Sequence, residues 1–151
     1  MNESAEFAKK TLEDILSFFG QNLEVSVKLS EDVIELSVPS SSMNGFLIGQ
    51  NGDNLRAMQH LLISILKNAE MELTRVNLDI AEYKKQRADR LAEQVMQWAE
   101  SVKSSDNPME LHPMNAADRR TVHKTIGEAE GLVSSSAGEG RDRHVVISPA
   151  S

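Results

Sequence analysis

Ile48-Gly49-Gln50-Asn51-Gly52 is the stretch that decides the fold of the first half of this 151-residue chain. Its two glycines are three positions apart and precede Leu55, Met58, Leu62 and Ile65, apolar residues at helical spacing. A tight turn between a short helix and a longer one is therefore predicted. Glycine lets the backbone pass close to a ligand, and the following helix offers amide donors at its start. The stretch is either a phosphate-binding loop or a helical turn without a ligand.

The residues around this loop predict a small α+β unit. A helix that ends at Gly20 precedes alternating runs at residues 23–29 and 34–38, which predict a hairpin, and a third strand is expected at residues 76–80. The predicted order is helix, strand, strand, short helix, glycine loop, helix, strand. This is a complete module that ends at about Ala81.

The second half predicts another α+β unit, with two helices and three short strands. Asn115 is expected to cap the second helix, with Asp118 at the capping-box position, and Gly131 is expected to end it. Two abutting domains, residues 1–81 and 82–151, are therefore predicted. The other expected elements of the second domain are a helix at residues 82–103 and strands at residues 110–112, 132–136 and 143–147.

Composition restricts the class of protein. The hydrophobic fraction of 40% and the charged fraction of 26% are typical of a folded globular protein. Without cysteine there is no disulfide, thiol nucleophile or thiolate metal site, and the four histidines form no metal-binding or catalytic motif with carboxylates. The sequence indicates neither a signal peptide nor a membrane-spanning run. We therefore expect a cytoplasmic protein that is not an enzyme, uses no metal or cofactor and is not inserted in a membrane.

Charge is distributed unevenly along the chain, whose net charge is −7. Residues 1–81 carry six basic against twelve acidic residues, whereas residues 82–151 carry ten against eleven. Local basic clusters can bind phosphate on an acidic protein, although such clusters are also common on faces that only meet water. The two clusters are Arg119, Arg120, His123 and Lys124, and then Arg141, Arg143 and His144.

Arg119 and His123 are four residues apart on a predicted helix, so they lie on one face of it. Arg120 and Lys124 form a neighbouring pair with the same spacing. The guanidinium fork of arginine matches phosphate, and histidine can donate a hydrogen bond from either ring nitrogen. From spacing alone, the pair is either a phosphate site or an ordinary feature of a helix surface.

The first domain resembles a type II KH domain over about residues 1–80. The resemblance rests on the stretch from Ile48 to Gly52 and on the order of the predicted elements. It implies a loop that holds the backbone of about four unpaired nucleotides beside an apolar groove for their bases. The RNA-binding residues of this loop would be Gly49, Gln50, Asn51 and Gly52. KH domains often have basic residues at the two middle positions, which are uncharged here.

The second domain resembles the R-three-H domain over about residues 82–150. The resemblance is carried by the stretches at residues 110–115, 118–123 and 138–146. This family is named for an arginine and a histidine separated by three residues, and it binds single-stranded nucleic acid. The resemblance implies that Arg119 and His123 contact phosphate. Further candidates for the same surface are Arg120, Lys124, Arg141 and Arg143.

A KH domain followed by an R-three-H domain is the arrangement of the bacterial Jag or SpoIIIJ-associated family, also called KhpB-like. Many members have an extra N-terminal domain and a basic linker, for which this sequence shows no counterpart. The resemblance implies a protein that binds single-stranded RNA, or single-stranded DNA, as an RNA chaperone or post-transcriptional regulator. It also implies a second small KH protein as partner and, in some bacteria, a link to cell shape.

A protein-interaction adaptor is the alternative function, in which both folds persist with little affinity for RNA. The acidic first half and the uncharged loop favour it. If the protein does bind RNA, two modest sites on one chain should act together, because tethering raises the effective concentration of the second contact. We then expect Gly52→Asp, and Arg119→Ala with His123→Ala, to weaken RNA binding without unfolding the protein.

Overall fold

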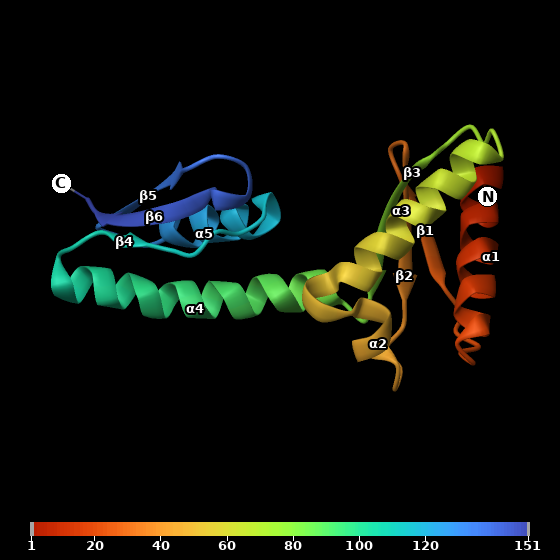
Figure 1. Ribbon diagram of the computed structural model, residues 1–151, viewed down its shortest axis with the longest axis horizontal. Helices are drawn as coiled ribbons and strands as arrows, with labels where there is room; N and C mark the ends of the chain where they lie inside the picture. The colour runs from red at the N-terminus through yellow and green to blue at the C-terminus, as the bar shows by residue number, and fades with distance from the viewer. Residues whose placement is uncertain (1, 151) are drawn as a thin grey trace. The chain divides into compact units, whose positions relative to one another are not determined.

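Two three-stranded sheets, each with its own helices and its own buried core, make up the protein (Figure 1). The computed structural model describes residues 2–150 and divides into one compact unit that ends at Lys84 and another that starts at Lys85. Both units are mixtures of helices and strands, as predicted. Along the described residues, no helix is both long enough and apolar enough to cross a membrane.

The first unit contains its elements in the predicted order. Asn2 caps the first helix, because its side-chain oxygen accepts hydrogen bonds from the amides of Ser4 and Ala5. The first strand starts at Ser26, later than the alternation from Leu23 indicated. The elements are α1 (Glu3–Phe18), β1 (Ser26–Ser30), β2 (Val33–Val38), α2 (Asn44–Ile48), η1 (Gln50–Gly52), α3 (Asp53–Asn68) and β3 (Arg75–Ile80).

The sheet of the first unit is mixed, with the order β1-β2-β3. β2 pairs antiparallel with β1 and parallel with β3. A parallel pair needs a crossover connection, which consists here of α2, the glycine loop and α3. Alternate residues of the strands, such as Ile34, Leu36 and Leu78, are buried with the apolar faces of α1 and α3 in one core. Leu47 of α2 lies in the same core, so both helices that flank the glycine loop are fixed to it.

The second unit has an antiparallel sheet with the order β4-β6-β5. α4 begins at Tyr83 and supplies Val95 and Val102 to its core, while α5 supplies Val122 and Ile126. Because β5 lies at one edge of this sheet, only one of its sides is paired with another strand. The elements are α4 (Tyr83–Ser105), β4 (Met109–Glu110), α5 (Ala116–Gly127), β5 (Leu132–Ala137), η2 (Gly140–Asp142) and β6 (His144–Pro149).

Two expectations about α5 are corrected by the structure. The helix ends at Gly127 instead of Gly131, and residues 128–131 form the turn into β5. Asn115 caps the helix as predicted, since its side-chain oxygen accepts a hydrogen bond from the amide of Asp118 at 2.9 Å. The carboxylate of Asp118, however, bonds the guanidinium of Arg87 on α4 and not the cap. A charged, two-pronged donor is a stronger partner for a carboxylate than one backbone amide.

Candidate nucleic-acid interface

The glycine loop turns sharply at Gly49, a position that only glycine fits. Its backbone has φ 75° and ψ 177°, and a Cβ there would lie 2.8 Å from Cγ of Asn54 and 2.9 Å from its backbone nitrogen. The Asn54 side chain in turn donates a 2.7 Å hydrogen bond to the carbonyl of Phe46 and thereby ties α3 to α2. Between the two helices, the side chains of Gln50 and Asn51 are exposed.

Gly52, the second glycine of the loop, is buried. Its φ is 78°, and a Cβ there would lie 3.0 Å from Cε1 of Tyr83 and 3.3 Å from Nη1 of Arg56. The expectation that Gly52→Asp would weaken RNA binding without disturbing the fold is therefore corrected. An aspartate would adopt a disfavoured backbone conformation and would press its side chain against Tyr83. Substitutions at the exposed Gln50 and Asn51 test the loop more cleanly.

Arg56 is a cation beside this loop that the sequence analysis missed. Its guanidinium lies close to Gly52 and forms a 2.5 Å ion pair with Asp53 in the first turn of α3. Both side chains are more than half exposed, so the pair contributes little to stability and can open to a ligand. The loop therefore has one adjacent positive charge, shared with an acidic neighbour, although its own middle residues are neutral. The only signal in the sequence was an arginine one turn after the second glycine.

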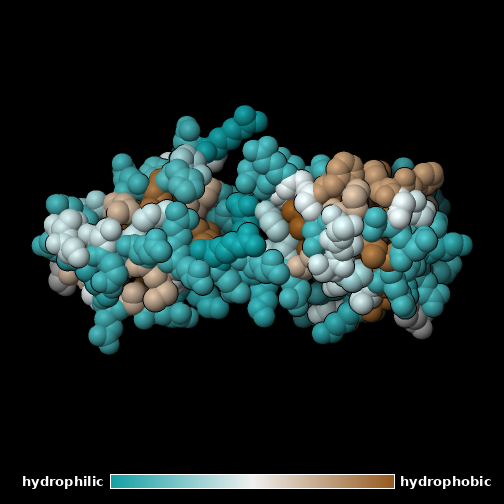
Figure 2. All heavy atoms as spheres, turned by 90° about the horizontal axis from the view of Figure 1, so that it is seen from below, coloured by the Kyte–Doolittle hydropathy of each residue, from teal (hydrophilic) through white to brown (hydrophobic). Residues whose placement is uncertain are grey.

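An apolar groove of about 270 Å³ adjoins the loop between α1, α2 and α3. The rings of Phe19 and Phe46 meet edge to face across it, with their centroids 5.3 Å apart. Figure 2 shows apolar side chains, in brown, gathered on the surface of the first unit. Phe18 and Leu61 are also exposed, with 87% and 47% of their surface accessible. The groove is lined by Ile15, Phe19, Phe46, Leu47, Asn54, Ala57, Met58 and Leu61.

Arg119 and His123 share one face of α5, as their spacing predicted, but this face is turned toward the rest of the unit. Both side chains are half-buried. Nδ1 of His123 lies 2.7 Å from the hydroxyl of Ser134, and Nε2 lies 2.8 Å from the hydroxyl of Ser136. Nη1 of Arg119 donates to the carbonyl of Met114, which uses one of the five guanidinium N–H groups. The pair holds β5 and the loop before α5 in place, so Arg119→Ala with His123→Ala would also disturb the fold.

Arg120 and Lys124, the neighbouring pair on α5, have exposed side chains. They stand one helical turn apart and bring two positive charges to the solvent side of the helix. In the hairpin between β5 and β6, Arg141 is exposed, whereas Arg143 is half-buried and donates a 2.9 Å hydrogen bond to the carbonyl of Gly138. Of the cationic candidates, three thus face water while Arg119 and Arg143 also bond to backbone carbonyls.

A second hollow of this unit, of about 220 Å³, lies between α4 and the start of α5. Arg87 and Asp118 bond across it in two-pronged geometry, with Nη2 to Oδ2 at 2.8 Å and Nε to Oδ1 at 3.2 Å. Nearby, the ring of His112 meets that of Trp98 edge to face. The sequence analysis missed Arg87, Arg90 and Gln94 of this hollow. It is lined by Arg87, Arg90, Leu91, Gln94, His112, Met114 and Asp118.

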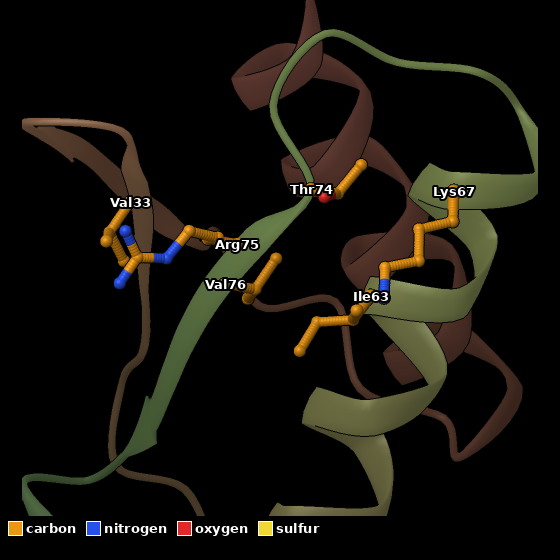
Figure 3. Close-up of a pocket in the computed structure, with 6 residues that line it drawn as sticks. All are labelled: Val33, Ile63, Lys67, Thr74, Arg75 and Val76. Atoms are coloured by element: carbon orange, nitrogen blue, oxygen red, sulfur yellow. The ribbon is translucent and has the colours of Figure 1, made fainter.

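A hollow of about 370 Å³ at the start of β3 contains two cations that do not converge (Figure 3). The ammonium of Lys67 turns toward Ile63, whereas Arg75 extends across the strand toward Val33, its partner on β2. In the view of Figure 3, β3 lies between the two charged groups. The lining residues are Val33, Ile63, Lys67, Thr74, Arg75 and Val76. Among residues 2–150, no cluster of acidic and histidine side chains is arranged to hold a metal ion.

Comparison with known families decides the class of the second unit, whose capped helix carries the Arg-x-x-x-His pair against an antiparallel sheet. Residues 85–149 match the R-three-H domain. The match begins where the second unit begins and ends at the last residue of β6. The matched range contains Arg119 and His123, which have the Arg-x-x-x-His spacing on α5, and the exposed charges beside them are Arg120 and Lys124.

The chain as a whole is similar to proteins named RNA-binding protein KhpB. It is 30% identical over 138 residues to the protein of Clostridium symbiosum, which covers 91% of this chain and 62% of that protein. It is 27% identical over 143 residues to that of Bacillus subtilis, covering 93% and 68%. The match to the Streptococcus pneumoniae serotype 2 protein, 26% over 129 residues, covers 83% of this chain and 39% of that protein. The chain thus spans between 39% and 68% of the length of these relatives.

Proposed function

We propose that this protein binds single-stranded RNA through two surfaces on one chain. The first is the glycine loop of a type II KH domain, residues 1–81, and the second is α5 of the R-three-H domain, residues 82–151. The observation that carries the proposal is the loop itself, which turns at Gly49, in a backbone conformation suited to glycine, so that Gln50 and Asn51 are exposed between two anchored helices. The names of the relatives, which describe them as RNA-binding proteins, support RNA as the ligand.

The two surfaces contact the phosphate backbone in different ways, mainly through hydrogen bonds at the loop and mainly through charge at α5. At the loop, the side-chain amides of Gln50 and Asn51 donate hydrogen bonds to phosphate oxygens, and Arg56 turns from Asp53 to supply charge. On α5, Arg120 and Lys124 supply charge together with the remaining N–H groups of Arg119. Neither surface needs to be tight alone, because binding at one raises the effective concentration of the strand at the other.

The cellular role that follows is that of an RNA chaperone or post-transcriptional regulator in the cytoplasm, working with a second small KH protein. The names of the relatives, which describe RNA-binding proteins, support the RNA-binding part of this role. The uncharged middle of the loop fits such a role, since a chaperone must release the strands that it holds. Single-stranded DNA should bind by the same contacts, because none of the proposed donors requires a 2′-hydroxyl.

Equilibrium binding to a labelled single-stranded RNA, measured by fluorescence anisotropy at about 50 mM and about 200 mM salt, tests the proposal. Affinity should fall as salt rises, with a log-log slope of about 0.7 for each phosphate neutralised. A duplex RNA of the same length should bind more weakly, because its bases cannot enter the groove beside the loop. Equal affinity for the duplex, or no binding at the lower salt, would overturn the proposal.

A protein-interaction adaptor remains the second candidate function, and the apolar groove of the first unit favours it. Phe18, Phe46 and Leu61 expose large apolar surfaces at or near this groove, on a unit with an excess of acidic residues. Contiguous apolar surface of this kind often marks a protein contact. The anisotropy experiment separates the two functions, since an adaptor would leave the RNA free at both salt concentrations.

A further inference from the structure

We propose that Ser134 and Ser136 of β5 form a phosphate-binding pair, and that His123 orients their hydroxyls without contacting the RNA strand itself. The ligand class is the phosphodiester group of a single strand. This inference rests on the proposed RNA binding, and it adds two residues of β5 to the contacts proposed at α5. His123 becomes a positioning residue.

The two serines lie on the same side of an edge strand. Residues alternate sides along β5, so Ser134 and Ser136 face α5 while Ser135 faces the other side of the sheet. Both serines are half-buried, and their hydroxyls lie 2.7 Å and 2.8 Å from the two ring nitrogens of His123. One imidazole therefore bridges two hydroxyl groups that would otherwise rotate independently.

The bridge leaves one serine hydroxyl hydrogen free to donate to a ligand. A neutral imidazole has one N–H and one lone pair, so one serine accepts a hydrogen bond from the ring and the other donates one to it. The accepting serine keeps its own hydroxyl hydrogen, which must point away from the ring. Phosphate oxygens only accept hydrogen bonds, and this outward hydroxyl is the donor that suits them.

His123 is poorly placed to make this contact directly. Both of its nitrogens already have serine partners at good distances. To donate to a phosphate, the ring would have to give up one of these bonds, which leaves no net gain in hydrogen bonds. The serine that accepts from the ring can donate to a phosphate without breaking either bond, because its own hydroxyl hydrogen is still free.

The neighbours of His123 on α5 make the approach to the serine pair positive. Gly127 follows His123 by one turn of α5, and a Cβ there would meet nothing within 4 Å. Arg120 precedes His123 by three residues, Lys124 follows it directly, and both are exposed. A phosphate at the serines would therefore lie beside two charges on α5 and would not meet a side chain at position 127.

Substitutions along β5 test the inference in the full-length protein. Ser134→Ala with Ser136→Ala should weaken binding of single-stranded RNA about tenfold, since hydrogen bonds to charged groups are the stronger ones. The slope of affinity against salt should not change, because no charge is removed. Ser135→Ala, the matched control on the other side of the strand, should bind within about twofold of the parent protein. Parent-like binding by the folded double variant would overturn the inference.

A second pair of variants separates loss of the hydroxyls from loss of stability. Threonine and valine have nearly the same shape and both favour strands, but only threonine has a hydroxyl. Ser134→Thr with Ser136→Thr should bind RNA nearly as well as the parent, whereas Ser134→Val with Ser136→Val should bind about tenfold more weakly. Equal affinity of these two variants would contradict a role for the hydroxyls.

The role of His123 is tested by coupling. If His123 acts through the serines, His123→Phe added to the double alanine variant should cause no further loss of affinity. If the ring contacted the strand directly, the two losses would multiply, and His123 would not be a positioning residue. If the parent protein itself bound no single-stranded RNA, the proposed function would be wrong. If the parent bound RNA and the serine variants bound it equally well, only the role of the serines would be wrong.

Discussion

The glycine loop and α5 present polar groups to solvent by opposite means. At the loop, the backbone is constrained by Gly49, and the exposed groups are the side chains between the two glycines. At α5 the backbone is an ordinary capped helix, and the exposed charges are Arg120 and Lys124, the neighbours of the motif residues. His123 itself bonds to β5. At the loop the exposed residues belong to the motif itself, whereas at α5 the exposed residues are the neighbours of the motif.

The largest effect is expected at the loop backbone. Gly49→Ala should lower the free energy of unfolding by about 3 kcal/mol, because alanine disfavours this backbone conformation and its Cβ would collide with Asn54. Urea unfolding followed by circular dichroism measures the loss. Gly45→Ala is the control, since a Cβ in that turn of α2 meets nothing within 4 Å. Equal stability of the two variants would show that the loop is not held by its first glycine.

At α5, by contrast, charge can be removed without loss of stability. Arg120→Gln with Lys124→Gln should weaken binding of single-stranded RNA about tenfold at low salt, and the log-log salt slope should fall by about 1.4 if each residue neutralises one phosphate. The thermal midpoint should stay within about a degree of the parent, because both side chains are exposed. An unchanged salt slope would remove these two residues from the interface.

The sequence predicted the elements better than it predicted the direction of their side chains. Hydrophobic spacing located α1, α3 and β3, and Asn115 was correctly assigned as the cap of α5. Spacing also placed Arg119 and His123 on one face. It could not say which face, since the partners of His123 lie 11 and 13 residues further along the chain and become neighbours only when β5 packs against α5. The burial of Gly52 depends in the same way on Tyr83, which is distant in sequence.

A gain of affinity is expected when charge is added to the glycine loop. Gln50→Lys places an ammonium at an exposed position where this chain has only amides. Binding of single-stranded RNA should become several-fold tighter at about 50 mM salt, with a salt slope steeper by about 0.7. Gln50→Glu, with the same length and the opposite charge, should weaken it. If both variants bound like the parent, the loop would not lie near a phosphate.

The smallest effect concerns His144, a half-buried histidine at the start of β6. Its Nδ1 donates to the carbonyl of Asp142 at 2.8 Å, and this bond, with further help from Glu110, raises the pKa of His144 above its usual value. Its protonated form is thus favoured in the folded state. The resulting stabilisation is complete below the unfolded-state pKa and is lost as pH rises through the higher folded-state pKa.

His144→Gln should therefore lose slightly more stability relative to the parent at about pH 5 than at about pH 8. Thermal unfolding of both proteins at the two pH values measures this difference. Glutamine cannot become charged, so it provides the comparison without a titrating ring. Identical pH dependence of stability in parent and variant would contradict the contribution of His144. The bonds of His144 go to a carbonyl and a carboxylate, whereas those of His123 go to two hydroxyls.

The most direct measurement of two-surface binding is a titration of the ¹⁵N-labelled protein with a short single-stranded RNA, followed by amide NMR shifts. We predict shifts in two groups, one at the loop from Gly49 to Gly52 and one at α5 and β5 around Arg120, Lys124 and Ser136. Both should move over the same range of RNA concentration, as expected for tethered contacts. Shifts confined to one group, or a protein whose spectrum RNA leaves unchanged, would contradict binding by both surfaces.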